Sequence, residues 1–197
     1  MKIGIDLNNV LRDTLKKIEQ VYEKWYIENF DDEEDDFEYE IKSPVTTLDI
    51  MSHLSFKDKE QLYDFLYNDF TMEIFGHAGS VEMTSMNDLN DFYLNMRERH
   101  DILIVSDEIG KSKPATLFFI SKFGCLIETI KFYSEQTKKE MWKSVDVLLT
   151  ANPELLLNKP SKKMVIKYET SFNKNIHTEH TITNLKEFEN KIKEIYG

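Results

Sequence analysis

Cysteine is almost absent from this sequence, and long apolar runs are absent altogether. Cys125 is the only cysteine, so the chain cannot form an internal disulfide bond, and its apolar setting in "FGCLIETI" favours a buried thiol over a reactive one. No stretch approaches the roughly 18 apolar residues of a membrane span. The N-terminal "MKIGIDLNN" turns polar by residue 6, unlike the apolar part of a signal peptide. We therefore expect a soluble, cytoplasmic protein that does not bind membranes.

Basic residues are also in short supply. The chain has 25 basic and 36 acidic residues, which gives a formal net charge of −11 at pH 7. An acidic surface repels phosphate backbones, so we expect no general nucleic-acid binding. Residues 31–36 are six consecutive acids. We interpret this run as a solvated loop, with a cation-binding or partner-binding patch as the alternative.

The hydrophobic pattern alternates between short apolar runs and amphipathic stretches. With 197 residues, 41% of them hydrophobic, the chain is long enough for one sizeable core. The pattern predicts buried strands at residues 2–7, 101–108, 129–134, 145–151 and 163–169, and helices at 14–29, 56–68, 86–99, 114–123, 152–158 and 185–196. Residues 42–54 are expected to be irregular.

Strands that alternate with helices predict an α/β fold with three layers and a Rossmann-like parallel sheet. The helical segment after the first strand interrupts this rhythm. We therefore predict a small helical cap at 15–75, inserted into a core domain that is formed by residues 1–14 and 76–197.

Polar residues follow several of the predicted strands. In a parallel sheet, the loops after the strand ends meet at one rim, where ligands bind. The candidates at this rim are Asp6, Ser106, one of Lys138 and Lys139, and Thr150 with Ala151. The residues alone leave open which lysine faces the rim.

The order of these groups resembles that of haloacid dehalogenase-like hydrolases, and in particular the 5′(3′)-deoxyribonucleotidase-like branch. The opening "IGIDLNNVLRDT" (3–14) is similar to the family opening, in which Asp-x-Asp-Gly-Val/Thr-Leu is typical. "ILIVSDE" (102–108) matches the second family motif, and "VDVLLTANPE" (145–154) is similar to the fourth, a strand that ends in two acids. "EIFGHA" (73–78) and "SFNKN" (171–175) resemble two further elements of the branch. The resemblance spans nearly the whole chain and rests on the shared order of the motifs.

The resemblance implies a phosphatase mechanism together with its loss. Asp6 stands where the family's nucleophile forms an aspartyl-phosphate, and Asn8 stands where a second aspartate acts as general acid and base. An amide cannot shuttle a proton, and general acid–base catalysis contributes roughly 10²–10⁴-fold. In an active site, Ser106 would bind the phosphoryl group, and Lys139, with Lys138 as the alternative, would neutralise its charge.

The resemblance also implies a magnesium site that this sequence does not complete. The family holds Mg²⁺ with the first aspartate, a backbone carbonyl and an acid at the end of the fourth strand. Here these positions are Asp6, the carbonyl of Asn8, and Thr150 with Ala151, which have no carboxylate. Glu154 is a possible replacement, whereas Asp146 lies about 13 Å back along a strand. We expect no cofactor, or Mg²⁺ only if the site is active.

Three hypotheses for the function remain. The first is a catalytically degenerate haloacid dehalogenase-like protein that acts as a structural or protein-interaction module, with a protein partner or self-association. Abundant Lys, Asn, Ile, Phe and Glu is typical of AT-rich genomes, including some phages, and extends this hypothesis to a phage structural component located in the virion. The second is a weak Mg²⁺-dependent 5′-nucleotidase or phosphatase acting through Asp6. The third is a nucleotide or phosphate binder without hydrolysis. His177 and His180 are interpreted as surface histidines, not as a metal pair.

Overall fold

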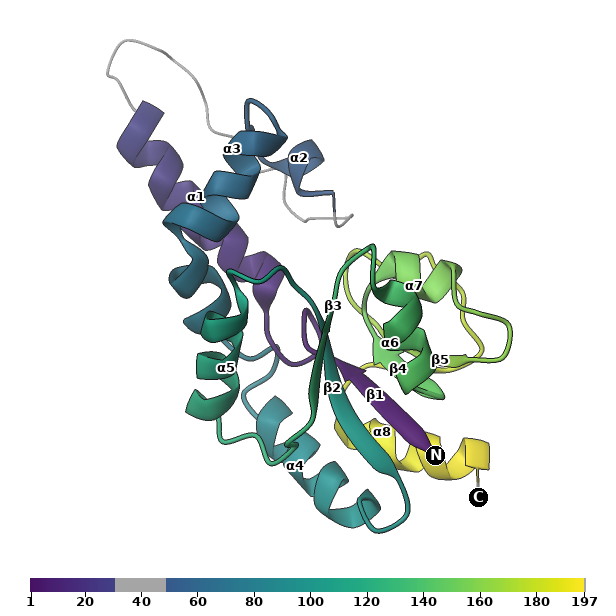
Figure 1. Cartoon of the computed structure of the whole chain (residues 1–197). Coiled ribbons are helices and arrows are strands. Elements are labelled where there is room, and N and C mark those ends of the chain that lie inside the picture. The colour runs from purple at the N-terminus through teal and green to yellow at the C-terminus, as the bar shows by residue number, and fades with distance from the viewer. Residues whose placement is uncertain (31–48, 197) are drawn as a thin grey trace.

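A parallel sheet forms the centre of the protein (Figure 1). The computed structural model describes residues 1–30 and 49–196. Its six strands lie in the order β3-β2-β1-β4-β5-β6, and all neighbours are parallel. The strands are β1 (Lys2–Asp6), β2 (Asp101–Asp107), β3 (Ile130–Tyr133), β4 (Val147–Thr150), β5 (Met164–Tyr168) and β6 (Thr181–Ile182). The predicted α/β class is confirmed, whereas the predicted acidic loop at 31–36 lies outside the described residues.

Helices cover both faces of this sheet and complete the three layers. On one face, the helices α4 (Ser85–Met96), α5 (Lys113–Lys122) and α8 (Lys186–Tyr196) share a buried apolar cluster with β1. On the other face, α6 (Lys138–Ser144) and α7 (Pro153–Leu157) share a second cluster with β2 and β4. Both faces of the central strands are therefore buried, which explains why these strands read as continuous apolar runs.

Gly4 shows how closely one of these layers approaches β1. A Cβ atom at this position would lie 2.6 Å from Cγ1 of Val145 and 3.1 Å from Cδ1 of Leu148. Only a residue without a side chain leaves room for Val145 to pack against the central strand. The glycine in "KIGID" is thus a packing requirement of the sheet.

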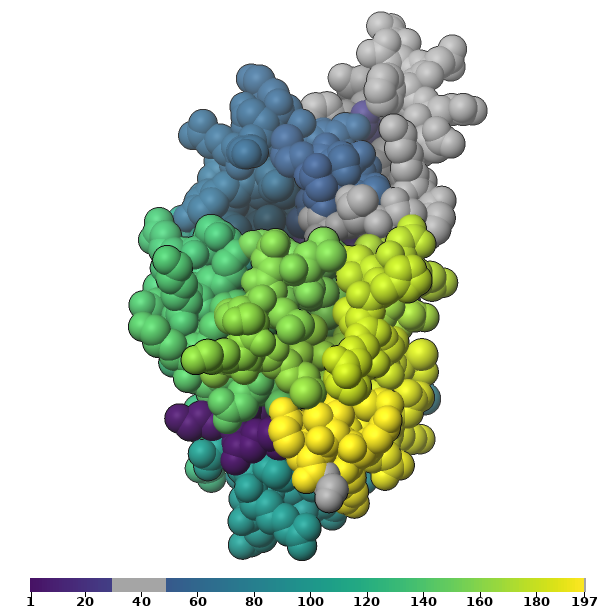
Figure 2. Space-filling model, turned by 90° about the vertical axis from the view of Figure 1, so that its right-hand side faces the viewer, coloured from purple at the N-terminus to yellow at the C-terminus, as the bar shows by residue number. Residues whose placement is uncertain are grey.

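The segment predicted as a cap has an apolar cluster of its own. It consists of α1 (Thr14–Phe30), α2 (Ile50–His53), α3 (Lys59–Asp64) and two π-helical turns, η1 (Phe65–Asp69) and η2 (Met72–Gly76). Tyr22, Phe65 and Ile74 are buried in this cluster, which continues onto Ala115 of α5. Figure 2 shows the cap helices, in blue, stacked on one end of the core, with the C-terminal helix, in yellow, at the other.

Four short elements differ from the sequence-based prediction. α2 lies inside the stretch expected to be irregular, and β6 has only two residues, too few to produce an alternating pattern. The turns η1 and η2 are closed by hydrogen bonds from Phe70 N to Phe65 O and from His77 N to Met72 O, which an α-helical period does not predict. None of the described helices is long and apolar enough to cross a membrane.

Candidate functional site

The candidate site lies where the strand order reverses. From β1 the chain builds outward through β2 and β3, and then crosses to β4 on the opposite side of β1. The loops after β1 and β4 therefore diverge to opposite faces and leave a crevice at the carboxyl end of the sheet. Asp6 is the last residue of β1, and Thr150 is the last residue of β4.

Asp6 is buried and bonded on one oxygen only. The hydroxyl of Thr150 donates a hydrogen bond of 2.6 Å to Oδ2 of Asp6. Oδ1 is buried and has no hydrogen-bond partner among the described residues. Burial raises the pKa of Asp6 from 3.8 to about 7; the Thr150 bond and the backbone N–H groups of Leu7 and Asn8 oppose this effect, and the nearby Asp107 carboxylate reinforces it. Near neutral pH a large fraction of this carboxyl is therefore protonated, which weakens it as a nucleophile.

The loop after β1 turns through a left-handed residue. Asn9 has a φ of 59°, a conformation that asparagine tolerates better than most residues and that glycine, typical of this position in the resembled family, adopts freely. The side-chain oxygen of Asn9 accepts a hydrogen bond of 3.0 Å from the backbone N–H of Leu15. This bond satisfies one of the free N–H groups at the start of α1 and ties the loop to the cap.

Arg12 is the centre of a buried network that the sequence analysis missed. Its side chain is fully buried, and all five of its N–H donors have partners. Nη2 lies 2.6 Å from Oε1 of Glu108, and the other acceptors are the side chains of Asn8, Thr14 and Thr116 and the backbone carbonyl of Phe75. The network joins the β1 loop, the end of β2, α5 and the returning cap segment. The available signal was a single basic residue directly after the apolar pair Val10 and Leu11, in the turn between the predicted first strand and the following helix.

This network fixes the orientation of the Asn8 amide. The amide oxygen accepts hydrogen bonds of 2.7 Å from Nη2 of Arg12 and 2.7 Å from the Thr14 hydroxyl. The amide nitrogen donates to Oγ of Ser106 at 3.4 Å, and Ser106 in turn donates to Glu108 at 2.9 Å. The oxygen is assigned from these contacts, since only that orientation gives every donor an acceptor. Asn8 and Ser106 are thus in direct contact.

The acids that follow Ser106 were not selected from the sequence. Glu108 is buried against Arg12, while Asp107 lines the crevice near Asp6. Burial raises the pKa of Asp107 to about 6, against the effect of Lys138 and with added repulsion from Glu135 and Glu154. Three glutamates, Glu108, Glu135 and Glu154, therefore repel the Asp107 carboxylate, and Lys138 offsets part of this repulsion.

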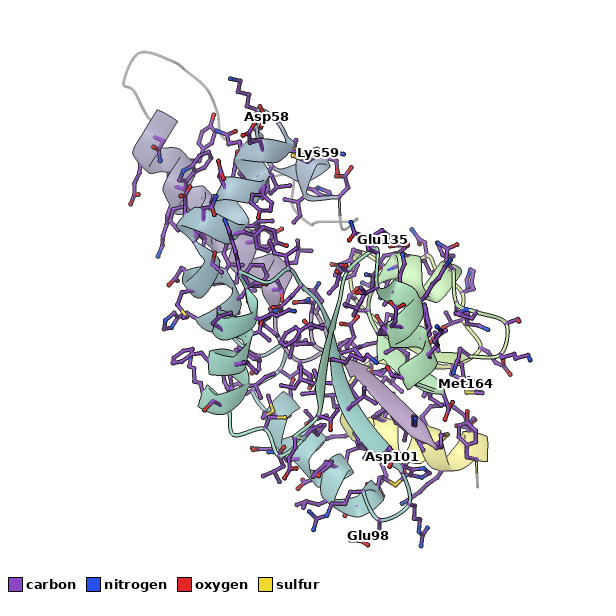
Figure 3. All side chains as sticks on the ribbon, viewed as in Figure 1. Asp58, Lys59, Glu98, Asp101, Glu135 and Met164 are labelled. Atoms are coloured by element: carbon purple, nitrogen blue, oxygen red, sulfur yellow. The ribbon has the colours of Figure 1, made fainter. Side chains whose placement is uncertain are left out.

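The two candidate lysines differ in burial and in their partners. Lys138 is partly buried and forms ion pairs with Glu135, at 2.7 Å, and with Glu154. Lys139 is exposed. Figure 3 places Glu135 at the end of the core that faces the cap, which is the side of the crevice. Lys138 is consequently the lysine beside the site, although its charge is already shared by two carboxylates.

The donors around Asp6 do not match the set that holds magnesium in the resembled family. Thr150 and Ala151 offer no carboxylate, and Glu154 is paired with Lys138. Asp146 precedes β4 at the other end of the sheet, where it accepts a hydrogen bond of 2.9 Å from the backbone N–H of Lys2. Within residues 1–30 and 49–196, no group of three or more His, Cys, Asp or Glu side chains is arranged to hold a metal ion. His177 and His180 line a different pocket, together with Asp146 and Lys163.

A pocket of about 540 Å³ lies between this rim and the cap. Its polar lining comes from the core and includes Asp6, Asn8, Asp107, Tyr133 and Glu154. Its apolar lining comes mostly from the cap: Leu15, Ile18, Ile50, Leu66, Tyr67 and Phe75. The η1 and η2 turns place Tyr67 and Phe75 in this lining, where their rings stack with centroids 5.6 Å apart. The volume suits a small organic ligand.

Comparison with solved structures identifies the fold. A haloacid dehalogenase-like hydrolase from Burkholderia xenovorans has a TM-score of 0.62 and 12% identity, over 98% of this chain and 96% of its own. A second, from Xanthomonas campestris, has a TM-score of 0.54 and 8% identity, over 99% and 95%. No protein-family model and no curated protein matches the sequence. The chain therefore has the fold of the haloacid dehalogenase-like hydrolases.

Proposed function

We propose that this protein is a catalytically silent relative of the 5′(3′)-deoxyribonucleotidase-like branch, which acts by binding and not by phosphoryl transfer. The observation that carries the proposal is the amide of Asn8, held in the place of the general acid by Arg12 and Thr14. An amide has no proton to give to a leaving oxygen at neutral pH and cannot deprotonate water.

The surroundings of Asp6 support the same proposal. Oδ2 of Asp6 accepts a hydrogen bond from the Thr150 hydroxyl, at a position where an active relative would offer a carboxylate to magnesium. A hydroxyl that points its proton at Asp6 adds no negative charge for a divalent cation. Without that cation the phosphoryl charge would meet the carboxylate of Asp107, whose pKa of about 6 leaves it mostly ionised at neutral pH, and like charges at short range in a buried site repel strongly.

Exposed apolar side chains favour a protein partner or self-association as the mode of action. Met72 of η2 and Leu117 and Phe118 of α5 are 45%, 50% and 43% exposed. Met72 and Phe118 lie side by side, since a Cβ atom on Gly76 would touch both of them. α5 is thus apolar on its outer face as well as on its inner one, which is typical of helices that meet another surface.

A phosphatase assay tests the absence of turnover. We expect hydrolysis of p-nitrophenyl phosphate and of deoxynucleoside monophosphates, with Mg²⁺, to be the same for the native protein and for Asp6→Asn. A Mg²⁺-dependent rate that Asp6→Asn abolishes would show instead a working nucleophile and overturn the proposal.

Light scattering tests the interaction. We expect either a defined oligomer or, with a partner, a stable complex, and Leu117→Ser with Phe118→Ser should weaken it. The exposed pair Lys122→Ser and Ser121→Ala on the same helix is the matched control. An interaction through this face would be contradicted if the native protein is a monomer and the two α5 changes leave its complex with a partner unaffected.

A further inference from the structure

The pocket beside Asp6 has an unusual balance of charge for a phosphatase-like fold. Among the described residues that line it, there are three acids, Asp6, Asp107 and Glu154, and no Lys, Arg or His. Two neighbouring cations are already engaged: Arg12 is bonded to Glu108, and Lys138 is shared by Glu135 and Glu154. The pocket is therefore suited to a positive charge and repels an anion.

Two buried polar atoms in the pocket lack a partner. Oδ1 of Asp6 and the hydroxyl of Tyr133 have no hydrogen-bond partner among the described residues, although their residues are 2% and 3% exposed. Both residues line the pocket. A buried polar group without a partner costs free energy, so a ligand that donates hydrogen bonds at this place would be favoured. An ammonium group has up to three such donors and a positive charge.

The opposite side of the pocket is apolar. Leu15, Ile18 and Leu66 of the cap face the rim together with the stacked rings of Tyr67 and Phe75. Phe75 already has the guanidinium of Arg12 5.2 Å from its ring centroid, so the aromatic wall tolerates a neighbouring cation. A ligand with a charged head and an apolar body would place the head against the core and the body against the cap.

We infer that this pocket binds a small organic cation, an amine joined to an aryl or alkyl body, with its ammonium group between Asp6, Asp107 and the Tyr133 hydroxyl. The inference rests on the proposed absence of phosphoryl transfer, because turnover would require an anion at the same place. Asp107 and Asp6 supply the charge, Tyr133 accepts one of the N–H groups, and the cap residues supply apolar contact area.

Three probes of the same shape and different charge test the inference. They are 2-phenylethylamine, the neutral 2-phenylethanol and the anionic 3-phenylpropanoate, each titrated calorimetrically into the full chain at pH 7.5. We expect the amine to bind at least tenfold more tightly than the alcohol, and the carboxylate to bind least. Equal affinities for the amine and the alcohol, or tighter binding of the carboxylate, would refute the inference.

Two variants and a control assign the binding to this pocket. Asp107→Asn and Asp6→Asn should each weaken amine binding about tenfold or more and leave alcohol binding unchanged, because only the charged contact is lost. Asp101→Asn removes an exposed carboxylate at the opposite end of β2 and should change neither (Figure 3). Unchanged amine affinity in both pocket variants would place the amine elsewhere and overturn the inference.

A titration with Mg²⁺ is the last part of the test. If Mg²⁺ alone binds and displaces the amine, the acids form a metal site and the inference fails. The phosphatase assay distinguishes a failure of the proposed function from a failure of this inference. Hydrolysis that depends on Asp6 would refute the proposed function whatever the amine does, whereas absent amine binding without hydrolysis would refute only this inference.

Discussion

Asp6→Asn should make the protein more stable at neutral pH, although it removes the residue at the centre of the site. Asp6 is buried with one oxygen unpartnered, and its pKa in the folded protein is about 7, against 3.8 for a free side chain. Between these two pH values the folded state holds a proton that the unfolded state releases. The free energy of unfolding therefore falls as the pH rises from about 4 to about 7 and then levels off.

The size of this effect follows from the two pKa values. Each pH unit between them is worth about 1.4 kcal/mol, so the native protein loses about 4 kcal/mol through this group. Asparagine does not ionise, so the free energy of unfolding of Asp6→Asn does not fall with pH through this position. Its unpaired buried N–H group costs about 1–3 kcal/mol, but this cost is the same at every pH and cancels in the comparison.

Urea unfolding followed by circular dichroism at pH 4 and pH 8 measures the difference. We expect the stability of Asp6→Asn relative to the native protein to increase by about 4 kcal/mol between these two pH values. Asp101→Asn, which changes an exposed carboxylate, should shift by less than about 0.5 kcal/mol. A change below about 1 kcal/mol for Asp6→Asn would mean that Asp6 ionises freely in the folded protein, and the account of a desolvated carboxyl would be wrong.

The remaining predictions concern the loop after β1. Arg12→Met leaves Glu108 buried without its cation and should lower the free energy of unfolding by about 3–5 kcal/mol, or the Tm by about 6–20 °C in calorimetry. The double variant with Glu108→Gln should recover part of this stability, and additive losses in the two single variants would refute the pairing. Asn8→Asp should restore no phosphatase activity, because the bonds from Arg12 and Thr14 would hold the new carboxylate ionised, so a Mg²⁺-dependent rate in this variant would contradict us. Asn9→Ala should be about 1–2 kcal/mol less stable than Asn9→Gly in urea, since both lose the bond to Leu15 and only alanine is strained at a φ of 59°; equal stabilities would exclude that strain.

The sequence by itself determined the α/β class and where the rim would be. Strands that are buried on both faces consist of consecutive apolar residues, and this local property is visible without a structure. Because parallel strands end at a common edge, the positions of Asp6, Ser106 and Thr150 at strand ends were enough to bring them together in the prediction. The sequence also shows an amide, Asn8, two residues after Asp6.

Only the tertiary structure decided the electrostatics of the site. Arg12 and Glu108 are 96 residues apart, and nothing in their local sequence marks them as a buried pair. Three further features depend on which side chains come into contact in the folded chain. They are the position of Lys138 beside the site, the unpartnered oxygen of Asp6, and the pocket between an acidic rim and an apolar cap. Hydrophobic periodicity reports how a residue faces its own helix or strand, whereas the energy of a charge depends on its burial and on partners that folding brings from elsewhere in the chain.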